Sequence, residues 1–356
     1  MRDVAVVGFA QRQMKDFDGS PSMAELLVPI LAECYEQTGW AKKDIGFWCS
    51  GSSDYLAGRS FSFVSAIDAI GVLPPVNESH VEMDAAWALY EAWIKIQTGE
   101  VDTALVFGFG KASAGVLRRT LSLQLDPYTM TPLWPDTVSL AALQARLGLD
   151  AGLWDEAALA EVVNRSLTDA EKNEYAVRAG GSSVSELLAR PLFADPLRKH
   201  DCAPVTDGAA AIVLAAGDRA YGANQRPAWI TGIAHSSDGL HLGTRDLTTS
   251  GSAERAAAAV GGTAGVQVAE LHAPFSHQEL VLRSALGLGD DVRINPSGGA
   301  LAANPMFSAG AIRIGEAAKR IWDGSADKVL GHATSGPALQ QNLVCVMEAQ
   351  ENGSGK

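Results

Sequence analysis

Cysteine is scarce in this sequence of 356 residues: it occurs four times, at positions 34, 49, 202 and 345. None of these cysteines belongs to a CxxC pair or to a cysteine–histidine cluster with the spacing of metal ligands. Short, regular spacings of that kind are what identify zinc sites and disulfide frameworks in a sequence. The sequence therefore predicts no metal site, and four thiols that pack in the core.

Basic residues and long apolar runs are also in short supply. The chain has 28 lysines and arginines against 41 aspartates and glutamates, so its formal net charge is −13. Nucleic-acid binding needs a positive field, and we expect no nucleic-acid partner. No apolar run reaches the roughly 18 residues of a membrane span. The first residues pass directly into a strand pattern without the apolar core of a signal peptide, so we expect a cytoplasmic protein.

What the sequence does contain is an alternation of short apolar strand patterns and longer helical patterns, which is typical of α/β proteins. This alternation repeats along the chain. A helix, a glycine, a short acidic link and an apolar strand occur at 84–113 and again at 307–336. Strand patterns at 4–10, 46–51 and 209–216 have counterparts at 228–234, 268–275 and 342–349. We predict two similar halves, residues 1–225 and 226–356, with an insertion at about 112–191 that passes over the mouth of the site.

Three segments carry a resemblance to a known family: 202-CAPVTDGAAAIVL-214, 271-LHAPFSHQEL-280 and 294-INPSGGALAANP-305. Together with the duplicated layout they resemble the thiolase superfamily. Within it they are most similar to the sterol-carrier-type thiolases and to the actinobacterial lipid-transfer group associated with steroid side-chain breakdown. The resemblance implies an α/β fold in which two similar βαβαβαββ halves form a five-layered αβαβα core, with a loop domain inserted in the first half. It also implies a coenzyme A thioester as the substrate, no bound cofactor, and a thiolase-like dimer partner.

The residues on which thiolase chemistry depends are missing. The resemblance places the nucleophilic cysteine near residues 82–84, where the sequence has Glu82 and Asp84. The histidine of the Gly-His-Pro motif is replaced by Asn304. The C-terminal cysteine or histidine is replaced at Gln341 or Asn342, with Cys345 inside the last strand. A carboxylate is a poor acyl acceptor, so we expect no covalent thiolysis.

Three polar residues remain as catalytic candidates, and each has a structural alternative. His272 matches the histidine of the sterol-carrier motif and suits acid–base work or oxyanion binding, or it is a core histidine satisfied by the backbone. Asn304 is either an oxyanion donor or the cap of a helix that starts near Met306. Asp84 is either a catalytic acid or the N-cap of a helix over 85–96.

Substrate-binding candidates lie in three places. The glycine pair Gly298 and Gly299 fits a close approach of backbone to a thioester. Tyr55 can present a phenol to a carbonyl, or it packs in a loop. Arg118 and Arg119 can pair with the phosphates of coenzyme A, or they form a solvated helix face.

Three functions are consistent with this pattern. The favoured one is a paired, structurally supporting lipid-transfer-type subunit of an acyl-CoA-processing complex in steroid side-chain catabolism. Its partner would be a thiolase-like paralogue or a second copy, and a zinc-ribbon and OB-fold protein is a further expected partner. The second is a retro-aldolase that cleaves a β-hydroxyacyl-CoA without a covalent intermediate. The third is an acetyl-CoA acyltransferase, that is, a plain thiolase.

Overall fold

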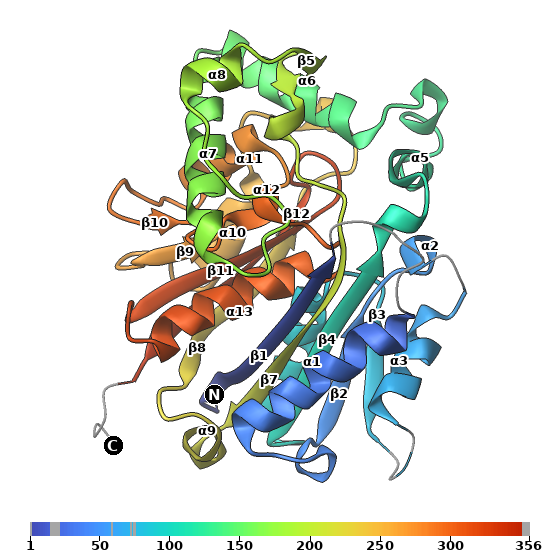
Figure 1. Ribbon diagram of the computed structural model, residues 1–356, viewed down its shortest axis with the longest axis vertical. Coiled ribbons are helices and arrows are strands. Elements are labelled where there is room, and N and C mark those ends of the chain that lie inside the picture. The colour runs from blue at the N-terminus through green and yellow to red at the C-terminus, as the bar shows by residue number, and fades with distance from the viewer. Residues whose placement is uncertain (1, 15–21, 58–59, 72, 74–75, 351–356) are drawn as a thin grey trace.

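The computed structural model describes residues 2–14, 22–57, 60–71, 73 and 76–350. Ten of the described strands form one sheet in the order β10-β9-β11-β12-β8-β1-β7-β4-β2-β3. Their bounds are β1 Val4–Met14, β2 Phe47–Gly51, β3 Glu78–Val81, β4 Thr103–Lys111, β7 Asp207–Ala216, β8 Ala228–Ser237, β9 Val268–Glu270, β10 Arg293–Ile294, β11 Lys328–Ser335 and β12 Gln341–Ala349. Figure 1 shows the two ends of this sheet on either side of the central strands β1 and β8.

The sheet consists of two five-stranded parts with the same topology. One part has the order β3-β2-β4-β7-β1 and the other has the order β10-β9-β11-β12-β8. In each part the first two neighbouring pairs are parallel and the last two are antiparallel. The two parts join through a short pairing of Ala5 with Trp229 and Val6 with Ala228. Each repeated strand pattern in the sequence therefore occupies the same place in its own part of the sheet.

Two helices, α4 (Ala85–Gln97) and α13 (Ala309–Trp322), pack against each other and form the middle layer. The chain runs directly from α4 into β4 and from α13 into β11, which is the order predicted for both halves. Close packing of α13 depends on small residues, since a Cβ atom at Gly315 would lie 2.2 Å from the Phe9 ring. The largest apolar cluster lies here, between the two parts of the sheet.

The outer layers are formed by the remaining helices of each half. On the first half, α1 (Met23–Thr38), α2 (Asp54–Ala57), α3 (Ser62–Ile70) and α9 (Asp218–Ala223) precede or follow the strands, and α1 packs on β1 and β7. On the second half, α10 (Gly251–Ala259) packs on β8 and β12 and on α11 (Ser276–Ala285). Separate apolar clusters fill these two outer interfaces. The architecture is the five-layered αβαβα arrangement expected from the sequence.

The inserted segment leaves the sheet after Lys111 and returns at Asp207. It contains α5 (Leu117–Leu123), α6 (Thr137–Asp150), α7 (Glu156–Asp169), α8 (Val184–Leu188) and a two-stranded sheet of β5 (Leu192–Ala194) and β6 (Leu197–Arg198). In Figure 1 it lies over α11 and α12 (Gly299–Ala302), and α7 contacts both helices. Asp155 caps α7 as predicted, through a 2.8 Å hydrogen bond from the Ala158 N–H. The small sheet lies after residue 191, and the predicted bounds of the insertion and of the two halves stay predictions.

Within the described residues, no helix has both the length and the apolar character needed to cross a bilayer. The same residues contain no group of three histidine, cysteine, aspartate or glutamate side chains placed to hold a metal ion.

Candidate functional site

Asp84 lies between the N-termini of the two middle-layer helices. Its Oδ1 accepts hydrogen bonds from the backbone N–H groups of Ala86, at 2.9 Å, and Ala311, at 3.1 Å. Its Oδ2 accepts a third from the N–H of Gly310, at 2.9 Å. One carboxylate thus caps α4, as predicted, and also the first turn of α13. Glycine at 310 is required by this contact, because a Cβ atom there would lie 2.7 Å from Asp84 Oδ1.

The electrostatics of Asp84 combine two opposing effects. Burial raises the pKa of Asp84, and the three backbone hydrogen bonds lower it. All three partners are N–H donors at helix N-termini, which carry partial positive charge. A protonated carboxyl would direct its own O–H at one of these donors, so the ionised form is the one the surroundings accommodate. Asp84 therefore has a structural role, because three of its lone pairs accept hydrogen bonds from the helix backbone and are not available to a substrate.

The described structure has no cysteine at this position, and all four cysteines of the chain lie elsewhere and are buried. Burial raises the pKa of Cys49, Cys202 and Cys345 to about 12, and that of Cys34 still further. The thiolate is the nucleophilic form of cysteine, so a thiol with such a pKa is inert near neutral pH. Cys345 lies within β12, as predicted, and is a core residue.

His272 and Asn304 are brought together from different elements. His272 follows β9, and its Nε2 lies 2.9 Å from Asn304 Oδ1. The amide oxygen is an acceptor, so Nε2 carries the proton, and Nδ1 accepts a 3.4 Å hydrogen bond from the Thr334 N–H. Both ring nitrogens of a neutral imidazole are thereby used.

Burial lowers the pKa of His272 to about 3; the nearby His332 adds to this effect and the bond to Asn304 opposes it. A general base needs a pKa near the working pH and a free lone pair directed at its proton. His272 has neither, and this geometry favours a positioning role over acid–base catalysis.

Asn304 does not cap a helix, so that expectation was wrong. The helix α13 starts later, at Ala309, with Ser308 at its N-cap position. The reason is local backbone: Phe307 has a φ of 66°, which helical geometry does not allow. Instead the Asn304 N–H donates a hydrogen bond to Thr206 Oγ1, and Asn304 Oδ1 accepts one from His272 Nε2. Among the described residues nothing accepts from Asn304 Nδ2, which leaves that group available as a hydrogen-bond donor.

The glycine pair is placed by packing inside the protein. Gly298 and Gly299 are buried and have φ values of 93° and 60°. A Cβ atom at Gly298 would lie 2.6 Å from the Cβ of Ala170, and one at Gly299 would lie 2.9 Å from the Asn295 side chain. The inserted segment thus approaches Gly298 closely, and Asn295 of the same loop approaches Gly299. These contacts already require glycine at both positions, and contact with a thioester stays a prediction.

The other predicted binding residues form a separate group near α5. Tyr55, on α2, has 63% of its surface exposed and lines a pocket of about 90 Å³ with Leu117 and Thr120. Arg118 pairs with Asp136, the N-cap residue of α6, so its charge is already engaged. Arg119 is exposed, with no ion pair to any described residue.

Gln341 and Asn342, the two positions to which the sequence assigns the last motif, are the first two residues of β12. Asn342 is fully buried in β12, where its Oδ1 accepts from His332 Nε2 at 2.9 Å and its Nδ2 donates to Ser252 Oγ at 2.7 Å. The turn before β12 instead occupies residues 336–340. Its left-handed residues are Gly336, Ala338 and Leu339. Gly336 is the usual glycine signal of such a turn, whereas alanine and leucine rarely adopt this conformation, so the sequence does not show the turn at 338 and 339.

Sequence reasoning also missed the residues that hold the loop beside His272. Asn295 Oδ1 accepts from the Leu271 N–H at 2.6 Å, and its Nδ2 donates to Glu279 at 2.9 Å. Arg165 of the inserted segment donates to both oxygens of Glu279. Asn295 and Glu279 belong to the segments that carry the family resemblance, and here they are structural.

Comparison with known proteins agrees with this architecture. No protein-family model matches the sequence. Among curated proteins it is 28% identical over 352 residues to the acetyl-CoA acetyltransferase of Methanocaldococcus jannaschii, an alignment that covers 89% of each chain. It is also 26% identical over 187 residues to the benzoylsuccinyl-CoA thiolase subunit BbsB of Thauera aromatica, covering 46% of this chain and 49% of that protein.

Solved structures match over the whole chain. The Ltp2-ChsH2(DUF35) aldolase superposes with a TM-score of 0.81 at 16% identity, covering 98% of both chains. Human mitochondrial 3-ketoacyl-CoA thiolase superposes with a TM-score of 0.77 at 14% identity, covering 98% of this chain and 99% of that one. The fold is thiolase-like. The sequence relatives and these structures together support a relationship to the thiolase superfamily.

On this thiolase-like framework the described site offers hydrogen-bond donors and no nucleophile. Asp84 is satisfied by two helices, the thiols are buried and protonated, and His272 is neutral. Asn304 Nδ2 is the remaining amide donor of the predicted catalytic set. The arrangement can orient and polarise a carbonyl oxygen, and it lacks the groups for acyl-enzyme formation.

Proposed function

We propose that this chain is a lipid-transfer-type, thiolase-like subunit of an acyl-CoA-processing complex and forms no covalent acyl-enzyme intermediate itself. The observation that carries the proposal is the Asp84 carboxylate, which takes all its hydrogen bonds from the helices α4 and α13 at the place where the resemblance puts the nucleophile. In this role the chain supports a catalytic partner. The substrate class is a coenzyme A thioester, with steroid side-chain catabolism as the process and the cytoplasm as the location.

The partner of this proposal is a thiolase-like chain, either a paralogue or a second copy. Two of the similar proteins support a heteromeric arrangement by their names, one as a Ltp2-ChsH2(DUF35) aldolase and one as a thiolase subunit. A zinc-ribbon and OB-fold protein is proposed as a further partner. The aromatic side chains of α4 are partly internal, since Trp87 is buried in the core and Tyr90 stacks on Trp93 with ring centroids 6.1 Å apart.

Retro-aldol cleavage of a β-hydroxyacyl-CoA is the second candidate. In this step a base takes the β-hydroxyl proton, the β-carbon becomes a carbonyl, and the electron pair of the broken carbon–carbon bond forms the thioester enolate. Because both nitrogens of His272 are engaged, solvent or a partner chain would serve as the base. One contact favours it: His272 donates to Asn304 Oδ1 and so directs the Asn304 amide N–H group away from itself. A fixed amide donor can stabilise the enolate oxygen that develops when the carbon–carbon bond breaks. This reaction requires no thiol, and one structural neighbour is named an aldolase.

Purifying the chain alone and together with the products of neighbouring genes separates these functions. Each sample is tested with a steroid β-hydroxyacyl-CoA and with a β-ketoacyl-CoA, and released products are followed by mass spectrometry. The supporting-subunit proposal predicts turnover only in the presence of a partner, and no loss of that turnover in Asn304→Ala. Turnover by the chain alone that Asn304→Ala abolishes would refute it and establish the retro-aldolase.

Asn304→Ala is preferred to His272→Ala as the diagnostic change. His272 is buried and binds the Thr334 backbone, so its removal also disturbs packing. Asn304 is partly exposed, and its variant is accepted only if its melting temperature stays near that of the wild type. Thr248→Ala, a position outside the candidate set that is partly exposed like Asn304, is the matched control.

A further inference from the structure

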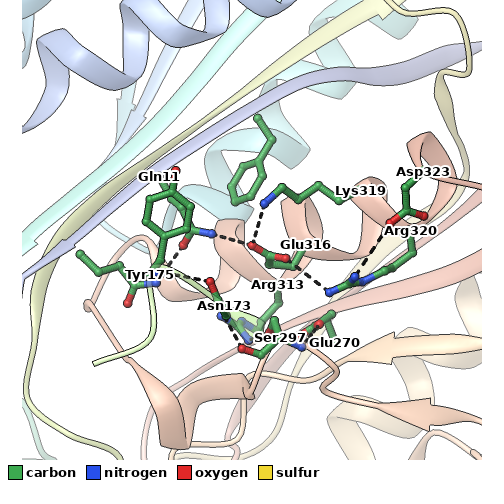
Figure 2. A network of polar contacts seen from close by, with 12 residues as sticks. Gln11, Asn173, Tyr175, Glu270, Ser297, Arg313, Glu316, Lys319, Arg320 and Asp323 are labelled. Carbon is green, nitrogen blue, oxygen red and sulfur yellow. Dashed lines mark hydrogen bonds and ion pairs between the residues drawn. The ribbon is translucent and has the colours of Figure 1, made fainter. Parts of the chain in front are cut away.

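A cavity of about 580 Å³ lies beside the C-terminal half of α13, separate from the His272–Asn304 pair. Its walls come from residues 172–175 after α7, from the loop 293–297, and from residues 316–323. It begins at Glu316, five residues beyond the Ala311 contact of Asp84, which is roughly 8 Å along a helix that rises about 1.5 Å per residue. Figure 2 shows the polar side chains that gather here.

Positive charge is concentrated at this cavity, although the whole chain is acidic. The basic residues in its lining are Lys172, Arg293, Lys319 and Arg320. Lys319 alone lies within hydrogen-bonding distance of a carboxylate, 3.3 Å from Glu316. Arg320 stays 3.8 Å from Glu316, and Arg293 stays 3.9 Å from Asp169. Lys172 is exposed and has no ion pair with any described residue.

The carboxylates in the lining leave this charge incompletely balanced. Glu316 is buried and accepts a 2.6 Å hydrogen bond from Gln11 as well as the bond from Lys319. Asp323 is half exposed and accepts from the Ser325 N–H at 2.8 Å. Glu174 is exposed to solvent. The lining therefore has four cations and three carboxylates, and Glu316 already accepts hydrogen bonds from Gln11 and Lys319.

The walls also offer apolar surface and unused donors. Two aromatic residues, Tyr175 and Trp322, line the cavity. The Nε–H of Arg320 and the Nε1–H of Trp322 are buried without an acceptor in the described structure. Buried donors without partners reduce stability, and a ligand acceptor that reached them would relieve this cost.

We propose that this cavity binds a small organic anion. Its carboxylate or phosphate lies among Lys172, Arg293 and Arg320, and a flat apolar part packs against Tyr175 and Trp322. The volume lies within the range of about 300–1,000 Å³ that is typical of small-molecule sites. This inference does not rest on the proposed function and stands whether or not the chain is catalytic.

The cavity is connected to the candidate site through its floor. Ser297 lines the cavity, and its N–H and Oγ bond to the two oxygens of Glu270 at 2.9 and 2.7 Å. Arg313 donates to the same carboxylate at 3.0 Å and to Ser297 Oγ at 2.7 Å. Glu270 ends β9, two residues before His272. A ligand in the cavity thus lies beside a buried hydrogen-bonded network that ends two residues before His272.

Isothermal titration calorimetry of the full chain tests the proposal with citrate, adenosine monophosphate and inorganic phosphate, at constant ionic strength. We expect saturable binding of citrate or adenosine monophosphate with a dissociation constant below about 1 mM. Citrate binding identifies a carboxylate ligand, and adenosine monophosphate binding identifies a phosphate ligand. The double variant Lys172→Ala/Arg293→Ala should weaken binding at least tenfold, because charge-assisted hydrogen bonds are the strong ones.

A charge-matched control distinguishes binding in the cavity from non-specific electrostatic attraction of the anion to the protein surface. Lys43→Ala/Lys199→Ala removes two exposed cations outside the cavity lining and should bind as the wild type does. The proposal is overturned if none of the three probes binds at millimolar concentration. It is equally overturned if the Lys172/Arg293 double variant binds like the wild type, or if both double variants lose affinity to the same extent.

Discussion

Replacing Asp84 by asparagine changes one oxygen of a buried carboxylate that holds the first turns of two helices. In Asp84→Asn the remaining oxygen can still accept from Ala86 and Ala311, but the new NH₂ group faces the N–H of Gly310. A buried donor left without an acceptor destabilises by about 1–3 kcal/mol. Loss of the negative charge at two helix N-termini adds about 0.3–1 kcal/mol for each helix.

One effect opposes these losses. Burial raises the pKa of Asp84, so the carboxylate itself is held at some desolvation cost that the neutral amide avoids. Taking the terms together, we expect Asp84→Asn to lower the free energy of unfolding by about 2–3 kcal/mol.

Urea denaturation followed by circular dichroism measures this change, with Asp155→Asn as the control. Asp155 caps the single helix α7 at an exposed position. Asparagine caps nearly as well as aspartate there, so this variant should lose less than about 0.5 kcal/mol. Equal stability of the two variants would refute the two-helix capping argument. A loss of catalytic turnover in Asp84→Asn at unchanged stability would instead show that Asp84 acts on a substrate.

Burial lowers the pKa of three histidines to about 3 or 4, and these are His272, His277 and His332. Below the unfolded pKa of about 6.5 these histidines take up protons in the unfolded chain but not in the folded chain, so the free energy of unfolding should fall as the pH is lowered from 7 to 5. The decrease is up to about 1.4 kcal/mol per pH unit for each histidine, and it should appear as a lower urea midpoint. Urea midpoints that do not change with pH would contradict this. Gly298→Ala should destabilise the protein by more than about 2 kcal/mol because the new Cβ atom would meet Ala170. Gly152→Ala, with open space around it, should destabilise by about 1 kcal/mol through its positive φ alone. Similar melting temperatures of the two variants would contradict the packing argument. Ellman's reagent should label none of the four buried cysteines in the native protein within minutes and all of them in guanidinium, and rapid native labelling would reveal a reactive thiol.

Much of the fold could be predicted because its signals are local and repeated. The alternation of strand and helix patterns indicated an α/β protein, and the second occurrence of the same pattern indicated duplication. The N-caps Asp84 and Asp155 stand directly before apolar helical patterns, where a short polar side chain is the usual helix start. The sequence alone shows that no cysteine lies near residue 84, and this absence is the strongest argument against covalent thiolysis.

The structure corrected the sequence where a role depends on distant partners. Gly298 and Gly299 looked like a ligand turn, but their neighbours are Ala170 and Asn295. Asn304 looked like a helix cap, but the positive φ of Phe307 prevents the helix from starting there, and the amide oxygen of Asn304 accepts a hydrogen bond from His272. Ala170 lies 128 positions from Gly298 and His272 lies 32 positions from Asn304, so no local sequence pattern predicts these contacts.

The sequence alone was enough for the fold class, the duplication and the helix starts at Asp84 and Asp155, because strand and helix patterns and N-caps are local signals, and the duplication is a second copy of those patterns. The missing nucleophile followed from the family resemblance. Only the tertiary structure decided that Asp84 serves two helices, that His272 is neutral and bound at both nitrogens, and that four cations meet at one cavity. Those properties arise from burial and from contacts between the two halves and the inserted segment. Burial and long-range contact set pKa values and hydrogen-bond partners, and the chain acquires both only when it folds.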